Sequence, residues 1–310
     1  MKKTAIVTGG SGFIGANLVN RLLKENFSVH IISRKDGDLW RLSKIKNKIS
    51  IHAGALDDGK KLKRLFNRIK PYAVFHLATY GSYPFQKDLQ KIIDVNIKAT
   101  CDLLESLRQT SYKNLVIAGS SSEYGKKDQV MREASILEPN NFYAAAKAAQ
   151  TYFCQVFAKT YNMPLVTLRL FNVYGPYEEK GRLVRSVIEA ALANQPVKLA
   201  TGKEARDFIY VEDAADAFLQ ATNFSDFKGE VFNIGTGRQL TIKQLAQKVF
   251  RILGIKPKLQ LNAYEGRRWD SYHWKADINK TAKLLKWKSK TSLEEGLQKT
   301  INWYKETVNE

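Results

Sequence analysis

Tyr143 and Lys147 stand four residues apart in the stretch YAAAK, which opens a long apolar helical segment after a Pro-Asn-Asn turn. Residues at this spacing project from the same side of an α-helix, so a phenol and an amine can face one cleft. A cationic amine lowers the pKa of a nearby phenol and prepares it for proton transfer. The spacing is also common by chance, so a catalytic interpretation depends on the rest of the chain.

A glycine-rich stretch, TAIVTGGSGFIG, follows the first expected strand and opens the first expected helix. In this setting the first glycine permits a tight turn, the second lets the backbone approach a pyrophosphate, and the third packs the helix against the sheet. The amino terminus of the helix adds free N–H groups for a phosphate. Dinucleotide binding is therefore predicted, with contacts from Gly9, Ser11, Gly12, Phe13, Ile14 and Gly15.

The end of the second expected strand, VHIISRKD, bears on which dinucleotide is bound. An NAD enzyme usually places a carboxylate at this position for the ribose 2′-OH, whereas the 2′-phosphate of NADP needs a cation. Ser33 occupies the expected acidic position, and Arg34, whose planar fork suits a phosphate, follows it. The pattern favours NADP(H), and Asp36 and Asp38 keep NAD(H) as the alternative if the strand ends earlier.

The elements that must carry these residues alternate in type along the first half of the chain. Short β-branched runs (KTAIVT, SVHIIS, ISIHA, AVFHLA, NLVIAGS and LVTLRL) are mostly separated by helical stretches near residues 13–25, 62–69, 94–109 and after Tyr143. Such alternation is typical of βαβ units. We expect an α/β fold, with a doubly wound parallel sheet (a Rossmann domain) over residues 1–170. A smaller mixed α/β C-terminal substrate lobe is expected mainly over residues 171–310, and RDFIYVEDAADAFLQAT predicts a return to the first domain near residues 208–235.

Composition and charge argue against membrane, nucleic-acid and metal binding. The chain of 310 residues, 44% of them hydrophobic, suffices for a sizeable core. Its amino-terminal apolar run stops at glycines, too short for a signal sequence or a membrane span, so we expect a cytoplasmic protein without a membrane partner. The net charge of +20 would suit an anionic partner, but its spread along the chain argues against nucleic acid. Cys101 and Cys154 are expected in the core, and the scattered histidines predict no metal site.

Seven motifs along the whole chain resemble those of the extended short-chain dehydrogenases/reductases, in the group of nucleotide-sugar epimerases, dehydratases and reductases. They are GGSGFIG, VFHLA, GSSSEYG, YAAAK, LRLFNVYGP, RDFIYVEDAADA and GRRWD, in the order of that family and at similar spacings. The resemblance implies a catalytic group of a serine or threonine with Tyr143 and Lys147. The tyrosine would pass a proton to or from a sugar oxygen while hydride moves to or from the nicotinamide, and the lysine would also hold the nicotinamide ribose.

The stretch GSSSEYG offers three serines for the catalytic position. Similar epimerases read SSSATVYG with the third serine catalytic, and a match without a gap selects Ser120, with Ser121 as the neighbouring alternative. Dehydratases of the group read TDEVYG and use the acidic pair to eliminate water. The same register puts Ser121 and Ser122 there and Glu123 one place late, so a 4,6-dehydratase is disfavoured, although a deletion before Tyr124 would restore the glutamate.

The resemblance also implies further binding residues. Leu77 and Ala78 of HLA should pass along the cofactor, and Asn96 of DVN resembles an asparagine buried beneath the site. Fork-shaped donors suit the diphosphate of a nucleotide sugar. The residues expected to bind the substrate are Thr79, Tyr80, Ser121, Asn172, Arg206 and Arg267.

We interpret the chain as an NADP(H)-dependent reductase of a nucleotide-linked 4-keto-6-deoxy sugar, because a net reductase consumes reduced cofactor and Ser33-Arg34 suits NADPH. The enzyme alternatives are an NAD-dependent nucleotide-sugar 4-epimerase, which needs the same catalytic group, and the less favoured 4,6-dehydratase. A non-enzyme alternative is a catalytically idle member that binds RNA through its positive surface. Similar proteins often dimerise through the helices that hold DVN and YAAAK, so a homodimer is expected.

Overall fold

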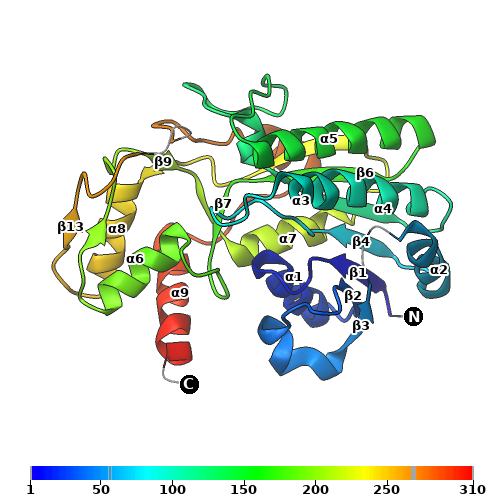
Figure 1. Ribbon diagram of the computed structural model, residues 1–310, viewed down its shortest axis with the longest axis horizontal. Helices are drawn as coiled ribbons and strands as arrows, with labels where there is room; N and C mark the ends of the chain where they lie inside the picture. Colours follow the sequence, from blue (N-terminus) through cyan, green and yellow to red (C-terminus); the bar gives the residue numbers. More distant parts are fainter. Residues whose placement is uncertain (1, 55, 57, 267–269, 309–310) are drawn as a thin grey trace.

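The computed structural model describes residues 2–54, 56, 58–266 and 270–308. A sheet of seven strands forms its centre, in the order β11-β6-β5-β4-β1-β2-β3 (Figure 1). Every neighbouring pair in it is parallel. The strands are β1 (Thr4–Thr8), β2 (Ser28–Ser33), β3 (Ile49–Ala53), β4 (Ala73–His76), β5 (Asn114–Ser120), β6 (Leu165–Leu170) and β11 (Lys228–Ile234). The predicted fold class, an α/β doubly wound parallel sheet, is confirmed.

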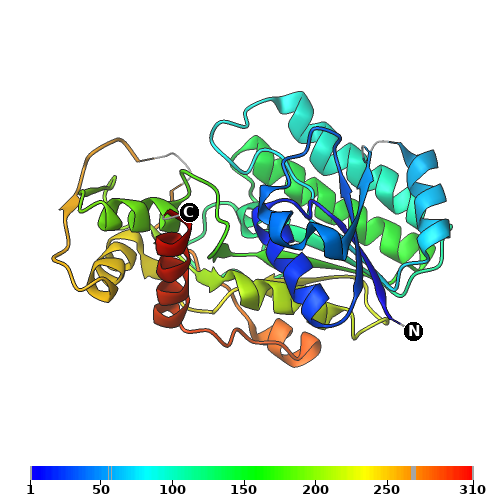
Figure 2. The same ribbon diagram turned by 90° about the horizontal axis from the view of Figure 1, so that it is seen from below.

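Helices cover both faces of this sheet, as the two ribbon views show (Figures 1 and 2). One face carries α1 (Phe13–Lys24) and α7 (Val211–Ala221); the other carries α2 (Gly59–Ile69), α4 (Ala99–Leu107) and α5 (Phe142–Tyr161). Strand β1 contributes side chains to the cores on both faces of the sheet, since Ala5 and Val7 pack on the first side and Ile6 on the second. Cys154 of α5 is buried in the second layer, as expected, whereas Cys101 of α4 is only half-buried.

The helix expected over residues 94–109 begins earlier and is not uniform. Helix α3 (Leu89–Ile93) runs into the π-helical turn η2 (Asp94–Lys98), which continues into α4. A π-turn widens the helix by one residue and is frequent at functional sites. Here it carries Asn96, whose side chain is completely buried.

A second group of elements forms a smaller lobe beside the sheet, and the last helix, α9 (Leu293–Val308), lies in it (Figure 2). Strand β7 (Asn172–Tyr174) pairs in parallel with β10 (Phe208–Tyr210), after which α7 and β11 lead the chain back to the seven-stranded sheet. No helix of the described residues is both long and apolar enough to cross a membrane. The remaining elements are α6 (Leu183–Leu192), α8 (Ile242–Ile252), β8 (Val197–Lys198), β9 (Ala205–Arg206), β12 (Leu240–Thr241), β13 (Leu259–Gln260) and the short helical turns η1 (Trp40–Lys48), η3 (Ser121–Tyr124) and η4 (Thr281–Leu285).

Candidate functional site

The glycine-rich loop packs so tightly that a side chain would not fit at Gly9 or at Gly15. Gly9 has φ +67°, and a Cβ there would lie 2.6 Å from the backbone of Leu77 and Ala78. A Cβ on Gly15 would lie 2.1 Å from the Gly9 carbonyl oxygen. The loop after β1 therefore touches the end of β4, which brings the predicted cofactor residues of the two stretches together.

The amino terminus of α1 is open to an anion. Its N-cap residue is Gly12, no side chain caps it, and its first turn holds no acidic residue. The free N–H groups of a helix start and its positive dipole end suit a phosphate. This loop and helix start therefore fit the pyrophosphate of a dinucleotide.

The second strand ends at the position predicted from the sequence. Strand β2 extends to Ser33, which is nearly buried and donates its hydroxyl to the Arg34 carbonyl oxygen at 3.2 Å. Arg34 is exposed directly after the strand. Asp38 lies further on and accepts the backbone N–H of Trp40 at 2.9 Å, so it is engaged in the turn before η1. The last residue of β2 is thus a serine, and an exposed arginine follows it. The strand itself carries no carboxylate.

The start of α5 places the phenol and the amine of the YAAAK stretch. Asn141 caps the helix by accepting the Ala144 N–H at 2.9 Å, and Tyr143 lies in the first turn. Lys147, only 2% exposed, donates from Nζ to the Ala118 carbonyl oxygen and to Gln150 Oε1, each at 2.5 Å. Because Ala118 belongs to β5 and Gln150 to α5 itself, the bond to Ala118 holds the helix start against the carboxyl end of that strand, and the bond to Gln150 orients the amine.

The hydroxyl groups around Tyr143 tune its acidity. Burial raises the pKa of this phenol, while hydrogen bonding with the side chains of Ser120 and Thr79 and the nearby charge of Arg182 lower it. The structure therefore brings Ser120, Tyr143 and Lys147 together at one end of the sheet. A phenol in this setting can donate or accept a proton at an adjoining oxygen.

The three consecutive serines point in different directions. Ser120 Oγ lies 2.7 Å from Ser122 Oγ and accepts the Ser122 N–H at 3.2 Å, in addition to its bond with the phenol. Ser121 is buried, and its Oγ accepts the indole N–H of Trp274 at 3.1 Å. Of the two candidates for the catalytic serine, Ser120 faces Tyr143 and Ser121 faces the smaller lobe.

A buried polar chain leads from Lys147 to the end of β1. Gln150 Nε2 donates to Thr100 Oγ1 at 2.7 Å, and His76 bridges Thr100 Oγ1 at 3.0 Å and Thr8 Oγ1 at 2.7 Å. Burial, with the charge of Lys147, lowers the pKa of His76 to about 3. The imidazole is therefore neutral, and its role in this chain is to accept and donate hydrogen bonds.

Asn96 fixes the segment after β4. Its amide oxygen accepts the Thr79 hydroxyl at 2.7 Å and the Tyr80 N–H at 3.3 Å. Its amide nitrogen donates to the Tyr80 carbonyl at 2.7 Å and to the Ile92 carbonyl at 2.8 Å. All four polar functions of this buried side chain are used, so it holds Thr79 beside the phenol.

On the other side, the smaller lobe contributes Asn172 of β7 and Arg206 of β9. Arg206 pairs with Asp270 (Nη2–Oδ1 2.9 Å), and its guanidinium lies 5.3 Å from the centre of the Trp274 ring. Trp274 in turn donates to Ser121, so Arg206 and the serine turn are linked through one indole. Arg267 lies outside the described residues.

Residues 5–235 match a family model described as the NAD dependent epimerase/dehydratase family. The chain belongs to this family. It is 30% identical over 316 residues to a UDP-glucuronate 4-epimerase of Thermodesulfobacterium geofontis (98% of this chain, 96% of that protein). It is 29% identical over 325 residues to a dTDP-D-glucose 4,6-dehydratase of Bos taurus (99% and 90%). A solved UDP-glucuronic acid 4-epimerase of Bacillus cereus, in complex with UDP-glucuronic acid and NAD, has a TM-score of 0.88 and 26% identity over 98% of this chain and 99% of that chain.

The predicted resemblance is thereby confirmed, and this chain is an NAD(P)-dependent enzyme that modifies nucleotide sugars. The glycine-rich loop, which has no room for a side chain at Gly9 or Gly15, and the open start of α1 fit the dinucleotide that the family uses. The nicotinamide of that cofactor supplies hydride transfer when it is bound.

Two basic residues near this epimerase/dehydratase site were missed from the sequence. Arg182, at the start of α6, donates to the Ser82 carbonyl at 3.3 Å, and its positive charge lowers the pKa of Tyr143. Arg41, 8% exposed, donates to the Tyr177 carbonyl at 2.9 Å and the Ser11 carbonyl at 3.4 Å, and pairs with Glu179. Arg182 and Ser82 are 100 residues apart and Arg41 and Tyr177 are 136 residues apart, so no local pattern could have revealed these contacts.

Proposed function

We propose that this enzyme is an NADP(H)-dependent reductase of a nucleotide-linked 4-keto-6-deoxy sugar. The observation that carries the proposal is the end of β2, where Ser33 takes the place of a carboxylate and the exposed Arg34 follows. An arginine can pair with the 2′-phosphate of NADPH, while a carboxylate there would repel it. Cells use the NADPH pool for net reductions, which makes a reductase the reaction class that fits this pairing.

In this proposal the residues of the chain handle one proton. Tyr143 gives its phenolic proton to the oxygen of the 4-keto group as that carbon becomes an alcohol. Ser120 and Thr79, which bond to the phenol, hold it and the substrate oxygen in line. Lys147, fixed by Ala118 and Gln150, stabilises the phenolate left behind and is placed to meet the nicotinamide ribose. The nucleotide diphosphate would be bound from the smaller lobe by Asn172, Arg206 and Arg267.

The test is a cofactor titration followed by a substrate screen. NADPH and NADH binding are compared by fluorescence, and NADPH oxidation is then followed spectrophotometrically with a panel of nucleotide-linked 4-keto-6-deoxy sugars. We expect tighter binding of NADPH and its oxidation with at least one nucleotide. Equal affinity for the two cofactors would remove the support that Arg34 gives.

A second candidate is an NAD-dependent nucleotide-sugar 4-epimerase, which the relatives favour because two of them carry that name. An epimerase needs no residue beyond the same catalytic group, since the hydride returns to the sugar within one cycle. It would also keep its cofactor through purification. Mass spectrometry of ligands released from the purified protein distinguishes the two: tightly retained NAD indicates the epimerase, and its absence with NADPH turnover indicates the reductase.

The 4,6-dehydratase alternative receives little support from the site. The two positions that carry the acidic pair in dehydratases hold Ser121 and Ser122 in the gapless register. The neighbouring Glu123 is completely buried in an ion pair with Arg169 (Nε–Oε2 2.7 Å), rather than facing the phenol. A dehydratase would need a free carboxyl group at the sugar to remove water.

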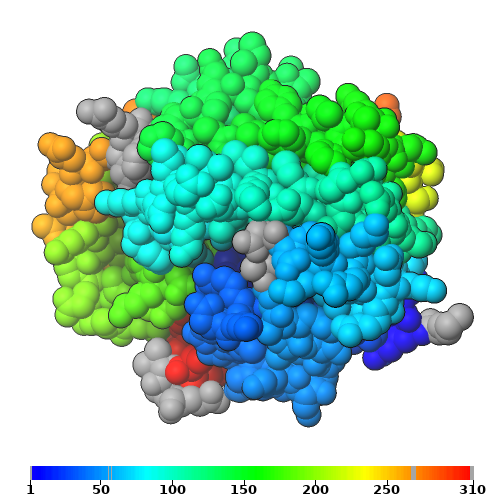
Figure 3. Space-filling view, turned by 45° about the vertical axis from the view of Figure 1, so that its right-hand side comes forward, coloured from blue at the N-terminus to red at the C-terminus, as the bar shows by residue number. Residues whose placement is uncertain are grey.

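We infer a homodimer formed by the face that α3, α4 and α5 share. On the space-filling view the cyan residues of α3 and α4 and the green residues of α5 lie side by side (Figure 3). Tyr152, Phe153 and Val156 of α5 are 56%, 43% and 61% exposed, and Leu89 and Ile93 of α3 are also exposed. Exposed apolar groups gathered on one face indicate a protein contact. Light scattering of the purified protein, with Val156→Asp as the disrupting variant, tests this.

A further inference from the structure

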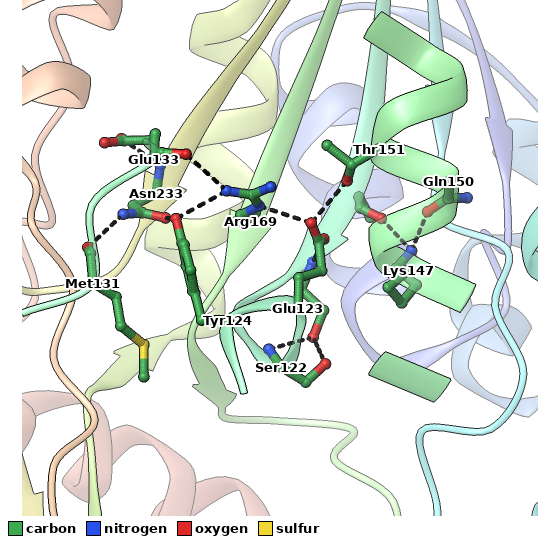
Figure 4. Close-up of polar contacts among 12 residues, drawn as sticks. Ser122, Glu123, Tyr124, Met131, Glu133, Lys147, Gln150, Thr151, Arg169 and Asn233 are labelled. Atoms are coloured by element: carbon green, nitrogen blue, oxygen red, sulfur yellow. Dashed lines mark hydrogen bonds and ion pairs between the residues drawn. The ribbon is translucent and has the colours of Figure 1, made fainter. Parts of the chain in front are cut away.

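The turn that carries Ser120 contains a carboxylate with no contact to solvent. Glu123 is 0% exposed, and its partner Arg169 of β6 has a side chain that is 4% exposed. Glu123 Oε2 accepts from Arg169 Nε at 2.7 Å and from Thr151 Oγ1 at 2.9 Å, while Oε1 accepts the Ser120 N–H at 2.8 Å. Figure 4 shows this carboxylate between Arg169 on one side and Thr151 of α5 on the other.

Arg169 is itself held in one orientation. Its Nη1 donates to the Tyr124 hydroxyl at 3.1 Å and to the Glu133 carbonyl at 3.2 Å. The Tyr124 hydroxyl in turn donates a hydrogen bond to Asn233 Oδ1 at 2.6 Å (Figure 4). A buried pair fixed on both sides costs desolvation energy and is weak evidence for stability alone, so a role at the adjoining site is a reasonable explanation for its presence.

We propose that Glu123 is a positioning residue of the catalytic group, whose buried carboxylate fixes the backbone of Ser120 and supplies the negative charge that balances the Lys147 ammonium. This proposal rests on the catalytic assignments made above. The first half of it follows from the capping box at η3, in which Ser120 and Glu123 bond each other's backbone and side chain reciprocally. The box fixes the Ser120 hydroxyl on the backbone of η3, and the same hydroxyl bonds to the phenol of Tyr143.

The second half follows from the surroundings of Lys147. Among the described residues, Lys147 Nζ donates to the Ala118 carbonyl and to the Gln150 amide oxygen, and both of these partners are neutral. Burial lowers the pKa of Lys147 to about 8, and the charge of Glu123 opposes that shift. Without this carboxylate, two cations, Lys147 and Arg169, would stand in one buried region with no anion between them.

Other titratable groups around the lysine remain neutral near physiological pH. His76 of β4 has a pKa of about 3, and burial raises the pKa of both Cys154 and Tyr143. Glu178, which pairs with Arg182, also has a pKa that burial raises to about 8. A change in cofactor binding between about pH 6 and pH 9 is therefore assigned to Lys147 by its response to substitutions at Glu123 and Arg169. The charged groups that face this region are Glu123 from η3, Arg169 from β6 and Arg182 from α6.

The test compares Glu123→Gln with Arg169→Gln by NADPH and NADH affinity as a function of pH, which requires no substrate. Cofactor affinity should fall at alkaline pH as Lys147 loses its proton, and this fall is the alkaline limb of the binding curve. Glu123→Gln leaves the charges of Arg169 and Lys147 without a nearby anion, so the alkaline limb should move down by about one pH unit. Arg169→Gln removes a cation and leaves the negative charge of Glu123 to Lys147 alone, so the same limb should move up. The double variant removes both charges of the ion pair, keeps the wild-type net charge of the cluster and should return toward the wild-type limb. Shifts in the same direction, or none in folded variants, would overturn the proposal.

Two further variants separate the positioning of Ser120 from the charge balance of Lys147. They also keep the proposal testable if Glu123→Gln or Arg169→Gln fails to fold. Glu123→Asp keeps the charge but shortens the reach to Ser120, so the limb should stay while turnover on a substrate from the screen falls. Thr151→Val removes a hydrogen bond to the same carboxylate without changing charge, so the limb should again stay. Thermal midpoints identify variants that fail to fold, in which case the aspartate and double variants decide. If no substrate is turned over even by wild type, the proposed function fails while the pH-dependent binding still tests this role.

Discussion

The two ends of the predicted cofactor site place their basic residues in opposite environments. At the catalytic end Lys147 is 2% exposed and is held by a backbone carbonyl and a glutamine. At the adenosine end Arg34 is exposed at the tip of β2. The first cation is oriented before any ligand arrives, and the second is left to be ordered by one.

This difference suggests a division of labour. Proton transfer needs groups held within a few tenths of an ångström, and the network of Asn96, Gln150 and Glu123 supplies that rigidity. Choice between two dinucleotides needs only the sign of a charge near the 2′ position. We therefore expect substitutions at the catalytic end to affect turnover strongly and those at the adenosine end to affect cofactor affinity selectively.

The largest expected effect is at the phenol. Tyr143→Phe keeps the ring and its packing but removes the hydroxyl, so turnover should fall by about 10²- to 10⁴-fold with an unchanged thermal midpoint and NADPH affinity. Tyr152→Phe, on the exposed side of the same helix, is the matched control and should keep full activity. A fully active and stable Tyr143→Phe protein would show that YAAAK is only a helix start.

Lys147→Met should reduce both turnover and cofactor affinity, because it removes the charge that stabilises the phenolate and the proposed ribose contact.

The same variant tests how Lys147 affects stability at different pH values. Burial lowers the lysine pKa from 10.5 to about 8, so between these values the unfolded chain binds more protons than the folded chain, and the stability attributable to Lys147 rises with pH. The thermal midpoint of wild type relative to Lys147→Met should therefore increase from about pH 8 to pH 10. A constant difference would contradict the buried ammonium.

Arg34→Ala tests the adenosine end. Loss of one charge-assisted contact with the 2′-phosphate should weaken NADPH by about 10- to 100-fold and leave NADH nearly unchanged. Arg64→Ala, on the exposed surface of α2, lowers the net charge equally and should change neither affinity. Equal losses for both cofactors would place Arg34 away from the 2′ position.

Local patterns were sufficient for the parts of the site that depend on neighbours in sequence. Strand and helix alternation predicted the parallel sheet, and the position of Ser33 followed from the end of one strand. The capping box that links Ser120 to Glu123 also has a recognisable spacing, a serine followed three residues later by a glutamate, but comparison with the dehydratase motif explains Glu123 only as a displaced acid.

Contacts between distant residues could not be predicted in the same way. Arg169 lies 46 residues beyond Glu123, and Arg41 lies 136 residues before Tyr177. Such pairs are decided by the order of strands and by how the smaller lobe returns to the sheet, which no single segment encodes. The π-turn at Asp94–Lys98 is a further case, because its sequence reads as ordinary helix while tertiary packing turns Asn96 inward.

The smallest expected effect concerns Arg206 in the smaller lobe, which belongs to neither end of the cofactor. Its guanidinium already pairs with Asp270 and lies against Trp274, so a substrate diphosphate would share a charge that is partly satisfied. Arg206→Ala should therefore raise the apparent Michaelis constant for the nucleotide sugar by only about 3- to 10-fold and leave NADPH affinity unchanged. Arg238→Ala, an exposed arginine of the same lobe, serves as the control for charge. Steady-state kinetics with the substrate from the screen, alongside NADPH titration, measures both quantities. Equal weakening of cofactor and substrate would assign Arg206 to the cofactor side and would remove the smaller lobe from diphosphate binding at this position.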